Sequence, residues 1–210
     1  MPGTVVLQGG GPFSLHDDLD RRLLSAVGAE RVVVLPTADA FERPEVLIAA
    51  GMSWAERLEI DIDIDVLMVM SRPEAMDAGA AEVVRSARAV WLVGDNPIHL
   101  RSVVKDTPVW EGLLAVLSAG GVVVGAGPSA SALCDPMIDP RGGALALGLG
   151  LVKGLALVSQ SETVTADRQA RARKLANVPL VFLPSSSALL RTDSGWENIG
   201  SHELVGALPN

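Results

Sequence analysis

The sequence has little cysteine, little histidine and no long apolar run. Its 210 residues include one cysteine, Cys134, which cannot form a disulfide within the chain. No apolar run reaches the roughly 18 to 20 residues that a membrane-spanning helix needs. The first residues, Met1 to Thr4, carry no basic segment of the kind that opens a signal peptide. These absences favour a cytoplasmic protein, and we expect that location.

Positive charge is also scarce. The chain has 17 Lys and Arg against 25 Asp and Glu, for a net charge of -8. Nucleic acid and acidic membrane surfaces are themselves negative, so we expect neither as a partner.

Patterns for a metal or a dinucleotide are incomplete. Glu59 to Val69 alternates isoleucine and aspartate like the start of a calcium loop. Val66 and Arg72, however, stand where such a loop needs glycine and glutamate. The loop Gly9–Gly11 lacks the GxGxxG spacing of dinucleotide-binding turns. We therefore expect no metal and no cofactor.

The order of the elements indicates the fold class. Short β-branched runs alternate with helical patterns, which is typical of an α/β three-layer sandwich around a doubly wound, mostly parallel sheet. We expect one domain over residues 1–210, because no linker or repeat interrupts the chain. The expected strands are 4–7, 31–35, 66–70, 89–93, 122–124, 155–158, 180–183, 188–191 and 197–199, the last two antiparallel. The expected helices are 15–27 (capped by Ser14), 44–58, 73–88, 108–119 and 166–176, with shorter ones after Asn96 and Ser129.

One stretch, Gly121 to Pro136, predicts a catalytic turn. A β-branched strand runs into Gly125-Ala126-Gly127-Pro128, and Ser129 then opens a short helix. A strand, a tight turn with a serine and a helix form a nucleophile elbow, whose helix N-terminus offers N–H groups to an oxyanion. Ser131 replaces the usual second glycine. The alternative is a strand-to-helix turn without chemistry.

Ligands of such sheets bind outside the carboxyl ends of the strands. That rule gathers several loops into one expected crevice. They are Gly9–Gly11, Asp39, Gly94–Asn96 and Ser129.

Motifs along nearly the whole chain resemble the motifs of a single protein family. Trp91–Asn96 resembles a strand that ends in Gly-Gly-Asp/Asn-Gln, and Gly127–Ala132 resembles Gly-x-Ser-Ala-Gly-Ala. With these and the segments below, the chain resembles the S51 serine peptidases, the cyanophycinase and dipeptidase E group. The resemblance implies a class I glutamine amidotransferase-like, flavodoxin-like fold. The other matching segments are Gly9–Gly11, Leu35–Ala38, Asp135–Ile138, Gly148–Gly154 and Ser187–Leu190.

The resemblance also implies roles for individual residues. Ser129 takes the nucleophile position, and the N–H groups of Asp95 and Ala130 line the oxyanion site. Gly94, Asn96, Gly10 and Gly11 line the substrate crevice. Substrates in that family are short acidic peptides or the β-linked Asp-Arg polymer cyanophycin. The glutamine amidotransferases of similar architecture use a cysteine at the elbow, but Cys134 lies five residues past Ser129 and is expected in the core.

Several positions depart from the family pattern. Gln160 stands where the family has its histidine base, and an amide cannot take a proton from serine near neutral pH. Val158 replaces the family's aspartate, and Pro97 replaces a substrate-contacting glutamine. The carboxylate of Asp95 would face a developing negative charge. His16, His99 and His202 lie elsewhere, and His16 is expected at the surface.

Three hypotheses follow. The first is a degenerate hydrolase that binds a small or peptidic ligand. The second is an active serine peptidase on acidic or β-aspartyl peptides, with Glu162 as a substitute base. The third is a non-catalytic interaction protein, and a homodimer is one form that it could take. The arginines of 166–176 are expected on a solvated face.

Overall fold

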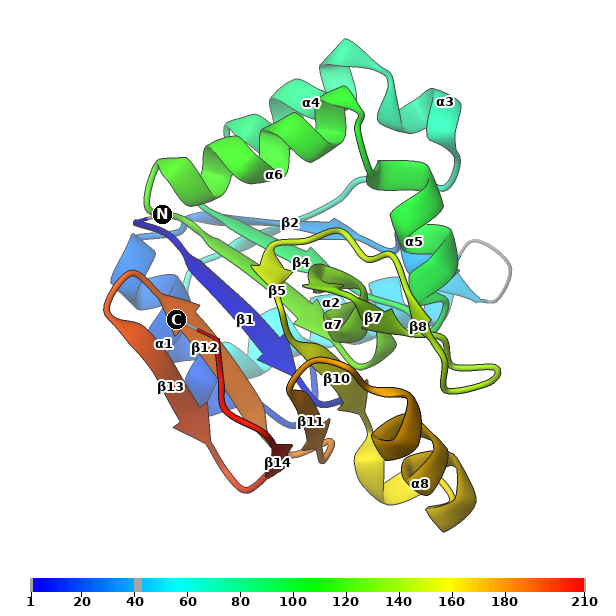
Figure 1. The fold of residues 1–210 in the computed structure, drawn as a ribbon. Helices are drawn as coiled ribbons and strands as arrows, with labels where there is room; N and C mark the ends of the chain where they lie inside the picture. Colours follow the sequence, from blue (N-terminus) through cyan, green and yellow to red (C-terminus); the bar gives the residue numbers. More distant parts are fainter. Residues whose placement is uncertain (1, 40–42, 210) are drawn as a thin grey trace.

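The computed structural model describes residues 2–39 and 43–209. Its centre is a seven-stranded sheet in the order β13-β12-β1-β5-β4-β2-β3 (Figure 1). Five neighbouring strands are parallel, and β12 and β13 add an antiparallel ribbon beside β1. Their bounds are β1 Thr4–Gln8, β2 Arg31–Leu35, β3 Asp63–Val66, β4 Ala89–Leu92, β5 Val122–Ala126, β12 Ala188–Thr192 and β13 Gly195–Ile199.

Helices cover both faces of this sheet. Alternate residues of a strand point to opposite faces, so Val33 and Leu35 of β2 join one core while Val32 and Val34 join the other. The first core packs under α4 (Ala78–Arg85), α5 (Pro97–Val104) and α6 (Pro108–Ser118), and the second under α1 (Asp17–Val27) and α2 (Pro44–Leu58). The predicted α/β sandwich with a mostly parallel sheet is confirmed.

Most observed bounds lie within two residues of the expected ones, and three of the differences have an identifiable physical cause. The strand expected at 66–70 is instead β3, because Ile62, Ile64 and Val66 face the core while the alternating aspartates face outward at the sheet edge. The helix expected at 73–88 divides into α3 (Arg72–Ala75) and α4, where Asp77 caps the second part. α1 begins at Asp17, since the Ser14 hydroxyl bonds to the Gly11 carbonyl instead of capping.

Part of the last third of the chain forms a second sheet that the sequence did not indicate. Its strands are β10 (Ala156–Ser159), β11 (Leu180–Leu183) and β14 (Glu203–Val205), with α8 (Ala166–Leu175) beside them (Figure 1). The strand expected at 180–183 therefore lies outside the main sheet. The connecting segment contains the short helix α7 (Pro128–Leu133) and four two-residue strands, β6 (Cys134–Asp135), β7 (Met137–Ile138), β8 (Leu145–Ala146) and β9 (Val152–Lys153).

No helix within 2–39 and 43–209 is both long enough and apolar enough to cross a membrane.

Candidate functional site

The turn between β5 and α7 bends at Gly127. β5 pairs with β1 as far as Ala126 opposite Gln8, and Gly127 then has φ 61° and ψ -134°. That backbone conformation is strained for residues with a side chain and suits glycine. The next residue, Pro128, is already the first residue of the helix. The tip of the elbow is therefore Gly127, two residues before Ser129.

A second glycine supports this register. An elbow needs a small residue two positions before its tip so that the helix can lie close to the strand. A Cβ atom on Gly125 would lie 2.8 Å from the Cα of Ala130 and 2.8 Å from Cδ1 of Leu133. Only glycine fits there without moving the helix. The pattern Gly125-Ala126-Gly127 thus occupies the place that we predicted for Gly127-Pro128-Ser129.

Ser129 does not face the crevice, and that part of the prediction is wrong. Its side chain is fully buried in the first turn of α7, where its hydroxyl donates a hydrogen bond to the Gly94 carbonyl at 2.9 Å. It bonds to no imidazole of the described residues. Ser129 therefore joins α7 to the loop after β4. It has the position of a structural residue, because a nucleophile needs an accessible oxygen.

Gln160 does lie at the elbow. A Cβ atom on Gly127 would be 3.6 Å from its Nε2 and 3.9 Å from the Cα of Gly10. The Gln160 N–H donates to the Gly9 carbonyl at 2.9 Å, and the residue has a left-handed backbone with φ 48°. The structure thus brings together the elbow tip, the glycine loop and the glutamine, and none of the three carries a nucleophile or a base.

The expected oxyanion donors are already engaged. The N–H of Ala130 bonds to the Gly127 carbonyl at 2.9 Å, and the N–H of Asp95 points to the Asp39 carboxylate at 3.3 Å. In an elbow, the residue after the tip normally provides an oxyanion N–H. Here it is Pro128, which has no N–H.

The loop after β4 has a structural role in this arrangement. The side chain of Asn96 caps α5 by accepting from the His99 N–H at 3.0 Å, and the backbone N–H of Asn96 donates to the Ala38 carbonyl at 3.0 Å. Gly94, with φ 114°, lies so close to Ala38 that a Cβ atom would approach its carbonyl carbon to 2.7 Å. Gly94 and Asn96 hold the loop beside the elbow.

The glycine loop packs against the protein itself. A Cβ on Gly9 or on Gly10 would collide with Pro184 or with the Ser185 side chain, and one on Gly11 would meet Leu15. These glycines therefore allow two loops to approach each other, whereas we predicted close approach to a ligand.

His16 ties these two loops together. Its Nε2 lies 3.2 Å from the Gly10 carbonyl and 3.0 Å from the Ser185 carbonyl, so this nitrogen carries the proton. Burial lowers the pKa of His16, against the effect of the two carbonyl acceptors. The expectation of a surface histidine is wrong, because the residue is only 5% exposed.

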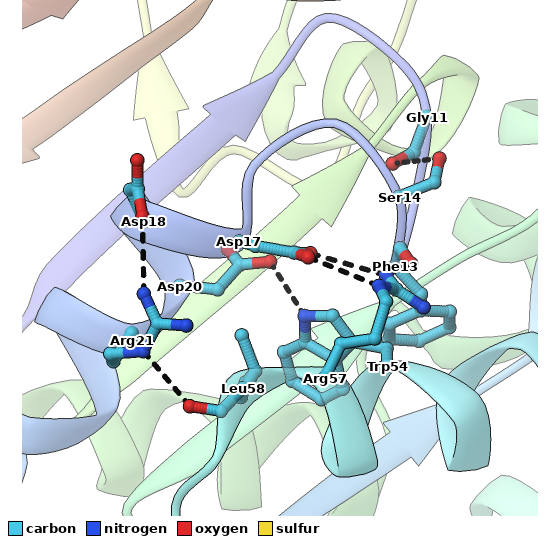
Figure 2. A network of polar contacts seen from close by, with 10 residues as sticks. All are labelled: Gly11, Phe13, Ser14, Asp17, Asp18, Asp20, Arg21, Trp54, Arg57 and Leu58. Atoms are coloured by element: carbon cyan, nitrogen blue, oxygen red, sulfur yellow. Dashed lines mark hydrogen bonds and ion pairs between the residues drawn. The ribbon is translucent and has the colours of Figure 1, made fainter.

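A polar network joins the segment that follows the glycine loop to α2 (Figure 2). Arg57 pairs with Asp17 and donates to the carbonyl of Phe13, whose ring lies 5.1 Å from that of Trp54. Beneath it, Trp54 donates to Asp20 at 3.1 Å (Figure 2).

Asp20 is nearly inaccessible to water and accepts a second hydrogen bond, at 2.6 Å, from the Gln8 amide. Burial raises the pKa of Asp20 to about 7, although both hydrogen bonds act to lower it. The last residue of β1, immediately before the glycine loop, is thus bonded to a carboxyl group that titrates near neutral pH.

A small pocket opens beside the elbow, and we call it the elbow pocket. Its volume of about 150 Å³ is below the 300–1,000 Å³ typical of drug-sized ligand sites, so it suits one side chain or a small group. Its walls are mainly apolar, with a few polar groups. They include Pro97, Pro128, Ser131, Val158, Gln160 and Arg168.

Arg168 is the cation of the elbow pocket. We expected the arginines of α8 on a solvated face, and Arg173 does pair with Glu203 there. Arg168 is also exposed, as expected, and it borders the elbow pocket, while the one acidic residue of the lining, Asp139, pairs with Arg141. An anionic group in the pocket would meet Arg168 as its counter-ion.

Glu162 is poorly placed as a substitute base. Both of its oxygens accept from the Ser185 N–H, at 3.2 and 3.1 Å. Burial acts to raise the pKa of Glu162, but these hydrogen bonds outweigh it and the pKa is lowered. Its side chain borders a different surface hollow from the elbow pocket.

Cys134 is fully buried, as expected for a core residue, and burial raises the pKa of its thiol. Across the described ranges there is no group of three or more His, Cys, Asp or Glu side chains that could hold a metal ion.

The solved structures that match this chain include two peptidases. No protein-family model matches the chain, and no curated protein sequence matches it either. A peptidase from an acI-B1 Actinobacterium is 20% identical with a TM-score of 0.84, over 98% of this chain and 94% of that one. The chain has a peptidase fold. A putative Peptidase E protein from Listeria monocytogenes EGD-e is 16% identical with a TM-score of 0.71, over 94% of this chain and 98% of that one.

Proposed function

We propose that this chain is a non-catalytic relative of the S51 peptidases that binds a small or peptidic ligand at the elbow. The observation that carries the proposal is the elbow itself. Its tip is Gly127, which has no side-chain atoms, and the space beside it is occupied by the Gln160 amide.

Three requirements of serine-type hydrolysis lack a residue at this elbow. The tip offers no oxygen nucleophile, and Gln160 cannot act as a general base. Pro128 offers no N–H to an oxyanion. Ser129, the serine nearest the tip, is buried and bonded to Gly94. Each loss alone would lower the rate by orders of magnitude, and together they favour a binding protein over an enzyme.

The ligand suggested by the pocket carries a carboxylate on a short side chain. Arg168 has no acidic partner among the described residues, and the pocket has room for one such group. A carboxylate paired with arginine forms charge-assisted hydrogen bonds. Short acidic peptides, the substrates implied by the family resemblance, meet this description.

Two measurements test the proposal. Aspartyl dipeptides and β-Asp-Arg should show no turnover above the background, and Ser129→Ala should leave that result unchanged. Calorimetry should detect binding of at least one of these peptides. Arg168→Gln should weaken that binding about tenfold, as expected for loss of one charge-assisted contact. Arg171→Gln, on the same helix but outside the pocket, is the matched control.

The result that would overturn the proposal is equally specific. Turnover on the order of 1 per second that disappears in Ser129→Ala would restore the active-peptidase hypothesis. The absence of binding to every peptide in the panel would leave the interaction-protein hypothesis, which a search for protein partners would then test.

A further inference from the structure

A second and larger cavity lies at the opposite end of β1. It is bounded by the start of β1, the β12–β13 ribbon, α6 and the loop that leads into β9 (Figure 1). Val5 lies four residue steps before Gly9, about 13 Å along a strand, and the cavity shares no lining residue with the elbow pocket, so the two are distinct. Its volume is about 640 Å³, within the usual range for small-molecule sites. We call it the tryptophan cavity, and its main lining residues are Val5, Lys105, Trp110, Lys153, Arg191 and Trp196.

The register of the strands places an arginine inside it. Arg191 of β12 is paired with Val5 of β1 on one side and with Trp196 of β13 on the other. Directly paired residues project from the same face of a sheet. Val5 belongs to the core under α6, so the half-buried Arg191 side chain lies on that face. Its guanidinium carbon is 5.6 Å from the ring centre of Trp196.

The opposite wall repeats this arrangement. The ammonium of Lys105 lies 4.1 Å from the ring centre of Trp110 and donates to the Leu149 carbonyl at 2.8 Å. The indole of Trp196 donates to the Pro209 carbonyl at 2.7 Å, which fixes the ring at the cavity edge. Two tryptophans, each with a cation over its face, thus border one cavity.

The charge balance of this cavity is opposite to that of the molecule. Its described lining has three cations and one carboxylate, Asp193, in a chain of net charge -8. Neither Arg191 nor Lys153 forms an ion pair within the described ranges, where the seven ion pairs involve other residues. A guanidinium has five N–H donors, and contact with a ring face satisfies none of them in the way an anion would.

We propose that the tryptophan cavity binds a small organic dianion that carries a flat ring, a phosphate monoester of mononucleotide size. The phosphate lies between Arg191 and Lys153, where the excess positive charge suits two negative charges. The ring lies against Trp196 and the apolar wall formed by Leu114 and Leu151. Aromatic side chains beside a cationic group are suited to stacking and charge recognition in one ligand.

Intrinsic fluorescence provides a selective readout. Of the four tryptophans, Trp54 and Trp91 are fully buried in the core of the other sheet face, while Trp110 and Trp196 border this cavity. Adenosine 5′-monophosphate is the probe, compared with adenosine and with inorganic phosphate, by fluorescence titration and calorimetry at low salt. Arg191→Gln and the exposed Lys153→Gln remove the proposed phosphate contacts. Arg171→Gln, which removes the same charge from α8, is the control.

The proposal requires adenosine 5′-monophosphate to quench the tryptophan fluorescence and to give a heat of binding in calorimetry. Adenosine and inorganic phosphate should each bind at least about tenfold more weakly. Each cavity variant should weaken binding about tenfold, and higher salt should weaken it further. Arg171→Gln should bind as the unchanged protein does. Equal affinity for adenosine and its monophosphate would overturn the proposal. Equal losses of affinity in Arg191→Gln, Lys153→Gln and Arg171→Gln would also overturn it. So would the absence of any binding of adenosine 5′-monophosphate to the folded protein.

Discussion

At the scale of single residues, Gly127 leaves the tip of the elbow without a nucleophile. An alanine Cβ there would meet the Gln160 amide at 3.6 Å and the Cα of Gly10 at 3.9 Å, both ordinary contact distances. The cost of Gly127→Ala should therefore come from the backbone, because φ 61° with ψ -134° is strained for alanine. We expect a loss of about 1–3 kcal/mol in the free energy of unfolding, measured by urea denaturation.

The control for this prediction is Gly142→Ala. Gly142 has no positive φ, and a Cβ there would meet nothing within 4 Å, so the change should be within about 0.5 kcal/mol. Equal stability of the two variants would show that the elbow backbone is relaxed at Gly127.

Asp20 predicts an unusual dependence of stability on pH. Its pKa rises from 3.8 to about 7 on folding, so between these values the folded state holds a proton that the unfolded state has released. Stability from this group is therefore greatest at low pH and falls as pH rises from about 4 to about 7. Three pKa units correspond to a change on the order of 4 kcal/mol.

Asp20→Asn should remove that slope. The amide has nearly the same shape and can still accept from Trp54. It can also donate to the side-chain Oε1 of Gln8 once that amide turns over, and this oxygen has no hydrogen-bond partner among the described residues. We expect the stability of the variant relative to the unchanged protein to increase steadily between pH 4 and pH 7, measured by denaturant unfolding at several pH values. A variant that is least stable, relative to the parent, at pH 8 would show that Asp20 is ionised in the fold.

At the scale of elements, the loops around the elbow depend on one another. His16 is the residue that joins the glycine loop to the turn at Ser185. His16→Ala leaves the buried Gly10 carbonyl and the part-buried Ser185 carbonyl without their donor, and should cost about 1–3 kcal/mol. Amide hydrogen exchange should quicken at residues 10–16 and 185–187.

His202→Ala is the matched control, because among the described residues His202 forms a hydrogen bond only with the exposed Asn198 side chain. We expect its effect to stay within about 0.5 kcal/mol. Faster exchange spread evenly over both sheets in His16→Ala would contradict the local role of His16.

The elbow also shows how far a local pattern can be interpreted. Its existence was predictable, because a β-branched strand followed by small residues and a helix has few other structures. Its register was not, since Gly125-Ala126-Gly127 and Gly127-Pro128-Ser129 both place glycine two residues before the tip. The hydrogen-bonded pairing of β5 with β1 decides between them, because it continues to Ala126. That pairing joins residues more than a hundred positions apart in the sequence.

At the scale of the whole molecule, local periodicity was sufficient for the main sheet and insufficient for the rest. Buried parallel strands such as Val122–Ala126 consist almost entirely of apolar residues, and the helices between them have a clear apolar face. The second sheet depends on contacts between β10, β11 and β14, and β14 has only three residues. The tryptophan cavity likewise gathers residues from both ends of the chain, so no single window of sequence reveals it.

The whole arrangement can be tested by restoring what the elbow lacks. Gly127→Ser provides a hydroxyl at the tip, where a Cβ fits at 3.6 Å from the residue-160 amide. Pro128→Ala restores the N–H that an oxyanion needs. Gln160→His supplies a base beside the new hydroxyl. Nucleophile, base and oxyanion donor act as a unit, so we expect the triple variant to hydrolyse aspartyl dipeptides far faster than any of the three double variants.

The informative comparison is with the double variant Pro128→Ala/Gln160→His, which keeps Gly127 and still contains Ser129. If the elbow tip is the nucleophile position, this variant stays inactive, and adding Ser129→Ala to the active triple variant leaves its turnover nearly unchanged. If Ser129 is the nucleophile, the double variant matches the triple variant and both lose activity on Ser129→Ala. The second outcome would require the buried hydroxyl to leave the Gly94 carbonyl and turn toward the crevice, so the two outcomes also differ in whether α7 must move.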